Sequence, residues 1–139
     1  MDNNNISFKI ETIELLDYSL SGKDKEIPLE AVFNFDINIE HRFDMQNNRI
    51  VAISNFKIFI EGIEGDVGRA SISCIYNILE MSKYVDGNDI TIPSEFITTI
   101  NSLSLSTSRG ILFMLFRGTF LHSAILPIIN PSNFKKELK

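Results

Sequence analysis

The sequence has few of the residues that cross-link small proteins or act as catalytic groups. It contains one cysteine, Cys74, so no internal disulfide can form, and only two histidines, His41 and His122. Its first residues lack the basic and then apolar pattern of a secretory signal. We therefore expect a protein of the reducing cytoplasm.

Long hydrophobic runs and excess positive charge are also missing. No window reaches the roughly 18 apolar residues of a membrane-spanning helix, so we expect no membrane insertion. The 7 glycines and 4 prolines exclude collagen-like and low-complexity chains. The net charge of −5 disfavours nucleic-acid binding, which needs a basic surface. With 139 residues, 44% of them hydrophobic, the chain is expected to form a single globular domain over 1–139.

The potential catalytic residues form no recognisable site. Neither histidine has a cysteine or second histidine at metal-ligand spacing, and no Gly-x-Ser-x-Gly elbow is present. Cys74 falls on the apolar face of a predicted strand, which favours a buried thiol, and His122 in its apolar neighbourhood is expected to be structural. The glycines within 62–68 precede a strand rather than a helix, so they are interpreted as a hairpin connection. We expect no enzyme, no metal and no cofactor.

Alternation of apolar and polar residues predicts a sheet. Isoleucines and 11 phenylalanines, both strand-favouring types, dominate the apolar residues. Strict alternation predicts that one face of the strand around 33–39 is buried and the other faces solvent, the two sets being Phe33, Phe35, Ile37 and Ile39 against Asn34, Asp36 and Asn38. Four antiparallel strands are predicted at about 6–20, 31–43, 50–61 and 69–81, the third being partly apolar on both faces.

One main helix is predicted within 93–117, after Pro93. Its apolar stripe starts at Phe96 and Ile97, passes through Ile100 and Leu103, and continues to Met114. Several serines within 102–108 are mediocre helix formers and predict a break near Ser106. The segment 111–116 is apolar on every side, so we expect it to be enclosed. The fold class is therefore α+β, with a four-stranded antiparallel sheet packed against a long C-terminal helix.

The apolar residues exceed what one helix on one sheet face would bury. Such a surplus indicates either a homo-oligomer, dimer or tetramer, or a groove for a polypeptide partner. The residues predicted to bind a polypeptide or form the subunit interface are Phe33, Phe35, Ile37, Phe56, Phe59, Phe113 and Phe116.

The C-terminal third resembles the SecB-type protein-export chaperones. The resemblance rests on Thr-Ser-Arg-Gly at 107–110, Arg-Gly-Thr-Phe at 117–120 and Leu-Pro-Ile-Ile-Asn-Pro at 126–131. The opening segment 6–13 is also similar to that family's first strand. The resemblance implies a sheet with helices on one face, subunits that pair and then form a tetramer, and ATP-independent holding of unfolded chains in apolar grooves.

The chain also departs from the family pattern. Ile128 stands where a second proline is expected, and the end of the chain, 135–139, is basic rather than acidic. The resemblance implies that Asp17 is a docking position for the export ATPase, whereas Ser21 stands where a second acid would lie. Three interpretations stay open: a general or export holdase, a SecB-like chaperone dedicated to one partner such as an antitoxin, and an enzyme, small-ligand domain or non-catalytic interaction domain on the same fold.

Overall fold

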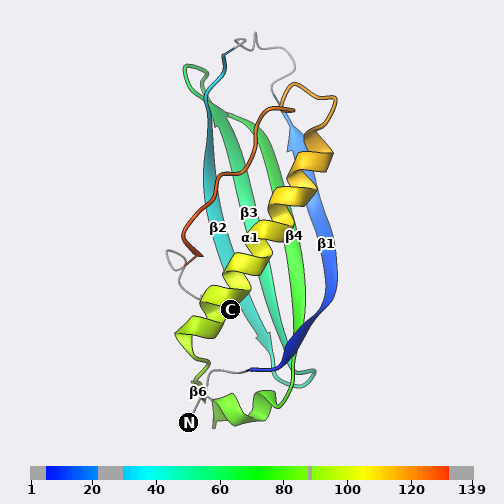
Figure 1. The fold of residues 1–139 in the computed structure, drawn as a ribbon, viewed down its shortest axis with the longest axis vertical. Helices are drawn as coiled ribbons and strands as arrows, with labels where there is room; N and C mark the ends of the chain where they lie inside the picture. Colours follow the sequence, from blue (N-terminus) through cyan, green and yellow to red (C-terminus); the bar gives the residue numbers. More distant parts are fainter. Residues whose placement is uncertain (1–5, 22–29, 88, 132–139) are drawn as a thin grey trace.

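The sheet has four long antiparallel strands and is crossed by one long helix. The computed structural model describes residues 6–21, 30–87 and 89–131. The main elements are β1 (Phe8–Leu20), β2 (Phe33–Asp44), β3 (Arg49–Ile60), β4 (Asp66–Ile78) and α1 (Ser94–Phe116). The strand order is β1-β4-β3-β2 (Figure 1). The predicted α+β class and all four strands are confirmed.

The sheet combines a meander with one returning strand. β2, β3 and β4 follow one another as hairpins, with Asn48 in the left-handed conformation in the first turn. β1 pairs with β4, so β1 and β2 form the two edges of the sheet. Most of the chain that joins β1 to β2, residues 22–29, lies outside the described residues.

Burial on β2 alternates as its sequence predicts. Its side chains on the face toward α1 are half-buried or buried, while Asn34, Asp36 and Asn38 are exposed. On β3, the mixed pattern is confirmed as well, because Ile53 on the opposite face is buried and Val51 and Phe59 are half-buried.

Helix α1 runs unbroken for 23 residues, so the predicted break near Ser106 is wrong. The predicted apolar stripe is correct through Ile100, and Leu103 is half-buried against the core, but the stripe is wrong at Met114, which is 66% exposed. The buried positions continue instead through Ser104, Ser108 and Phe116. The small serines let the helix lie close to the sheet, where the Ser104 hydroxyl shares a 2.8 Å hydrogen bond with the Tyr76 hydroxyl.

Short elements connect the sheet to the helix. β4 ends at Ile78 rather than at Met81, and Glu80 has a positive φ of 56° that terminates the extended chain. A 3₁₀ helix, η1 (Met81–Tyr84), and a two-stranded hairpin of β5 (Val85–Asp86) and β6 (Asp89–Ile90) follow. The alternation pattern did not predict these elements.

After α1 the chain turns back and crosses the sheet beside the helix (Figure 1). The Arg109 side chain donates hydrogen bonds to the Leu126 and Pro127 carbonyls, from Nε at 2.8 Å and from Nη2 at 2.9 Å. Asn101 donates to the Pro131 carbonyl at 3.4 Å, and its Oδ1 accepts a 2.6 Å bond from Nε2 of buried His41. Residues 121–131 therefore form a crossing segment that helix side chains hold in place.

The core lies between the sheet, α1 and this crossing segment. The expectation that 111–116 is enclosed is wrong for Phe113 and Met114, which are exposed. His122 is also exposed rather than structural in an apolar environment; the buried histidine is His41. Within the described residues, no helix has the length and apolar character needed to span a bilayer.

Candidate functional site

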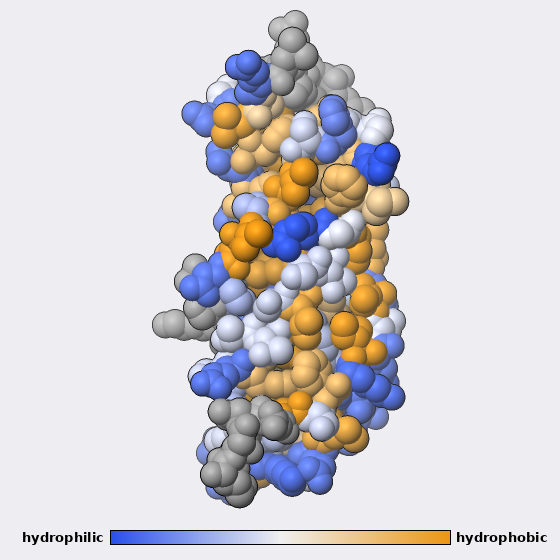
Figure 2. Space-filling view, in the orientation of Figure 1, coloured by the Kyte–Doolittle hydropathy of each residue, from blue (hydrophilic) through white to orange (hydrophobic). Residues whose placement is uncertain are grey.

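The apolar side chains of edge strand β1 are the most exposed in the sheet. Every residue between its two terminal positions is exposed. Four of its apolar side chains share the face of the buried β4 residues that they pair with, and we call them the β1 strip: Ile10, Ile13, Leu15 and Tyr18. They are 38–49% exposed because α1 makes its main contacts with β3 and β4. Figure 2 shows hydrophobic side chains along the right flank, where Figure 1 places β1.

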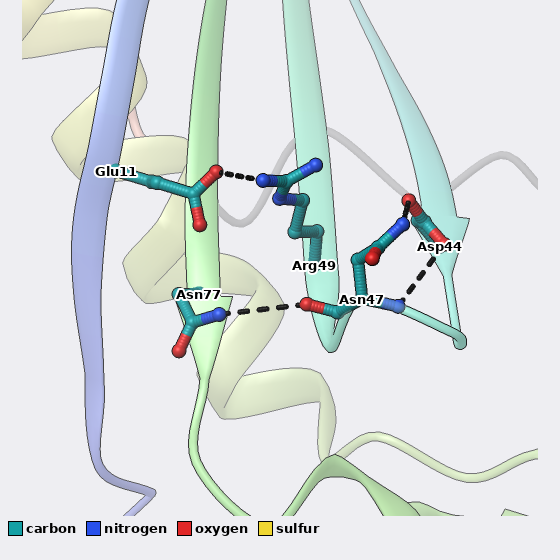
Figure 3. Close-up of polar contacts among 5 residues, drawn as sticks. All are labelled: Glu11, Asp44, Asn47, Arg49 and Asn77. Carbon is teal, nitrogen blue, oxygen red and sulfur yellow. Dashed lines mark hydrogen bonds and ion pairs between the residues drawn. The ribbon is translucent and has the colours of Figure 1, made fainter.

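An ion pair holds β1 on the opposite face of the sheet. Oε2 of Glu11 lies 2.6 Å from Nη2 of Arg49, which belongs to β3, so the contact reaches across β4 (Figure 3). Beside it, Asn77 of β4 donates a long 3.5 Å hydrogen bond to the Asn47 carbonyl in the β2–β3 turn. The edge strand is therefore fastened to the sheet while its strip stays open.

A second exposed apolar surface lies at the end of α1. Phe113 is 41% and Met114 66% exposed, and we call these two side chains the helix-end patch. Met114 also borders an open hollow of about 520 Å³ whose floor includes Gly110. Because glycine has no side chain, it leaves this part of the helix face open.

The crossing segment adds a third surface, the crossing ridge, formed by Ile125 and Ile128. Leu126 points into the core, whereas Ile125 is 55% and Ile128 93% exposed. The Arg109 hydrogen bonds to the carbonyls of Leu126 and Pro127 fix the backbone between these two side chains. The crossing ridge therefore exposes two aliphatic side chains on a backbone that the Arg109 hydrogen bonds hold in place.

The structure distributes the predicted site residues over several environments. Phe33, Phe35 and Ile37 are half-buried on the α1 side of β2, and Phe59 is half-buried on the opposite face of β3. Phe113 is exposed. Phe56 and Phe116 are buried in the core, so in this chain they support the fold and present no surface to a partner. Asp17 is exposed on β1, next to Ser71 of β4.

The sequence pattern did not predict the β1 strip or the crossing ridge. The first strand was predicted from its alternation, but alternation indicates only which side chains share a face. Whether another element covers that face depends on contacts between residues far apart in the chain. The high exposure of Ile128 had one signal: an apolar residue between two prolines, in a segment that cannot form a regular helix.

The buried titratable groups beneath α1 are structural. Burial raises the pKa of the Cys74 thiol and of the Tyr76 hydroxyl, and a hydrogen bond from Ser104 opposes each shift only in part. Cys74 therefore stays protonated rather than forming a reactive thiolate. The described residues include no group of three histidine, cysteine, aspartate or glutamate side chains placed to hold a metal ion.

Comparison with known proteins supports the fold. No protein-family model and no curated protein sequence matches the chain. Its fold is similar to that of the SecB-like chaperone Rv1957 of Mycobacterium tuberculosis, solved in complex with a ChAD peptide from the Rv1956 HigA1 antitoxin. The two share 13% identity at a TM-score of 0.56, over 87% of this chain and 83% of the other.

Proposed function

We propose that this chain is an ATP-independent chaperone that holds unfolded polypeptides on the helix-end patch and the crossing ridge. The observation that carries the proposal is the exposure of four large apolar side chains, Phe113, Met114, Ile125 and Ile128, on a hydrogen-bonded scaffold. Contiguous exposed apolar side chains mark interaction surfaces in soluble proteins. The net charge of −5 keeps such a protein soluble.

Binding to these surfaces requires no nucleotide. Burial of apolar area contributes about 25 cal/mol per Å², so several modest contacts add up to a useful affinity. Such contacts discriminate little between sequences but strongly between folded and unfolded chains, because only unfolded chains expose many apolar side chains. The mechanism is a reversible covering of exposed segments.

The β1 strip fits a second copy of this chain. Its residues 10, 13, 15 and 18 are spaced symmetrically about Glu14. If two β1 strands pair antiparallel about that position, Ile10 meets the partner's Tyr18 and Ile13 meets the partner's Leu15. This pairing satisfies the free backbone edge and brings the two strips side by side on one face, where each buries part of the other's apolar area. The family resemblance implies that two such pairs form a tetramer, which would cover the rest.

A chaperone dedicated to one partner is the second candidate. The similar Rv1957 structure contains an antitoxin peptide, which favours a polypeptide segment of a single partner as the ligand. For export, Asp17 remains the one position at which an export ATPase would dock, since Ser21 offers no second carboxylate.

Suppression of aggregation tests the proposal. The purified chain, without nucleotide, should reduce light scattering from several unrelated refolding proteins. Ile128→Ser should weaken this effect, whereas Leu79→Ser is the matched control, because Leu79 is 59% exposed but lies outside both surfaces. No suppression for any substrate, together with tight binding of one polypeptide, would favour the dedicated chaperone. Equal losses in both variants would contradict the assignment of the ridge.

A further inference from the structure

We propose that a hollow at the end of α1 binds a carboxylate of the held polypeptide, next to an apolar side chain of that polypeptide. The hollow has a volume of about 580 Å³ and is lined by Phe113, Arg117, Gly118, Thr119 and His122. The inference rests on the proposed function, because the ligand is a segment of a bound polypeptide. It adds a charge preference to a surface that otherwise selects only for apolar character.

The floor of the hollow is a rigid turn. Gly118 has a φ of +78°, which turns the chain back immediately after the helix. The Thr119 backbone N–H and hydroxyl both donate to the Phe116 carbonyl, at 3.0 and 2.7 Å, and the same hydroxyl accepts a bond from the Leu121 N–H at 3.1 Å. The site is therefore positioned before any ligand arrives, which lowers the entropy cost of binding.

The positive charge of Arg117 has no acidic partner in the described part of the chain. Arg49, Arg69 and Lys83 form ion pairs, and Arg109 is used by two carbonyls. The Arg117 guanidinium instead lies over the Phe113 ring, 5.8 Å from its centre, and no carboxylate lines the hollow. This arrangement leaves the guanidinium donors available to an incoming carboxylate.

His122 lines the rim with a fixed ring. Its Nδ1 donates to the Thr119 carbonyl at 3.1 Å, so Nε2 of the neutral ring is an acceptor, and among the lining side chains Arg117 supplies the donors for a carboxylate. The end of a helix carries partial negative charge that would repel an anion. Here the Phe116 carbonyl already accepts two hydrogen bonds, which offset part of this negative charge. The full positive charge of Arg117 outweighs the rest.

The adjoining side chains define the rest of the ligand. Phe113 and Met114 are exposed beside the charged group. The ligand that fits is therefore a polypeptide segment with an aspartate or glutamate next to an aliphatic or aromatic residue. Its carboxylate would bind Arg117 in the hollow, and its apolar side chain would pack on the helix-end patch.

A pair of synthetic peptides tests the inference. Two labelled, unstructured apolar peptides would differ only by one aspartate or asparagine at the centre, and fluorescence anisotropy would measure their dissociation constants with the full chain. The aspartate peptide should bind about two- to fivefold more tightly at low ionic strength, as expected for an exposed ion pair. The preference should fall in high salt.

Variants assign the preference to Arg117. Arg117→Gln should bring the ratio of the two dissociation constants to one, whereas Lys57→Gln, which removes an exposed cation from β3, should leave the ratio unchanged. Equal binding of both peptides by the unaltered chain would overturn the carboxylate site and leave the chaperone proposal standing. Failure of both peptides to bind would contradict the chaperone proposal and this site with it.

Discussion

The two edge strands of the sheet have opposite environments. On β2, the side chains toward α1 are half-buried or buried and most of the alternate ones are exposed, whereas on β1 both sets are exposed between the two terminal residues. Each edge pairs with one neighbour, so backbone pairing does not distinguish them. The difference is in what lies above them: apolar side chains of β2 pack against the core under α1 and the crossing segment, and most of β1 lies beyond that cover. Exposure of an edge is thus decided by the layer above it.

The largest expected effect is on the free energy of unfolding, and it is tested at two residues that pair across β1 and β4. Leu15 and Ile72 lie opposite each other, but Ile72 is fully buried and Leu15 is 38% exposed. Ile72→Ala should lower the free energy of unfolding by about 2–5 kcal/mol, as for other buried aliphatic residues. Leu15→Ala should cost less than about 1 kcal/mol in the dissociated subunit. Urea denaturation at low protein concentration measures both, and equal losses would show that β1 is covered within the subunit.

The next prediction concerns assembly. Ile13→Lys should raise the dissociation constant of the proposed β1-paired oligomer by more than about tenfold, because the new charge would have to lose water where the two strips meet. Phe59→Lys, at a residue that the sequence assigns to the partner or subunit interface, should dissociate the proposed oligomer less, since Phe59 is half-buried on the opposite face of β3. Light scattering measures the mass, and circular dichroism checks that the sheet persists. A monomeric unaltered chain at micromolar concentration would contradict the assignment of β1.

A smaller effect is expected where the crossing segment is fastened. Arg109→Gln removes hydrogen bonds to the Leu126 and Pro127 carbonyls, and should lower stability by about 1 kcal/mol. Hydrogen exchange in residues 121–131 should become faster. Arg42→Gln is the matched control because Arg42 is exposed and has no hydrogen bond or ion pair among the described residues. Similar changes in both variants would show that Arg109 does not fasten the segment.

The smallest effect is a pH dependence at the β2–β3 turn. The hydrogen bond from the Asn47 side chain, at 2.8 Å, holds the pKa of Asp44 below its ordinary value (Figure 3). A lowered pKa in the folded state means that the contribution is present above the ordinary pKa and is lost as pH falls through the folded one. The difference in melting temperature between the unaltered chain and Asp44→Asn should therefore shrink in acid. A constant difference from pH 7 to pH 2 would contradict this.

The spacing of apolar and polar residues in the sequence was sufficient to predict β2 and the start of α1. It did not predict which side chains of the rest of α1 face the sheet. Strict alternation over 33–39 has one interpretation, and the structure confirms it. The helix face beyond Ile100 was assigned to apolar residues, but the sheet instead receives Asn101, Ser104 and Ser108, whose small or hydrogen-bonded side chains suit a close approach.

The candidate site was harder to predict than the fold. Its residues are the apolar side chains that no other part of the subunit covers, and the sequence does not show which ones these are. Phe56 and Phe116 look like binding residues by type, yet both are in the core. Ile128 and the β1 strip are exposed because of where α1 and the crossing segment end. Similarly, the sequence neighbours of His122 are apolar, but the turn at Thr119 directs its ring outward.

The most direct test of the account is to titrate the chain with one polypeptide in two states. A permanently unfolded protein, reduced and carboxymethylated, and its native disulfide-bonded form would be compared by isothermal titration calorimetry without nucleotide. We expect the unfolded form to bind at least about tenfold more tightly, with the negative heat-capacity change of apolar burial. Equal affinity for both forms, or no binding of the unfolded form, would contradict the proposal that the exposed apolar side chains hold unfolded chains.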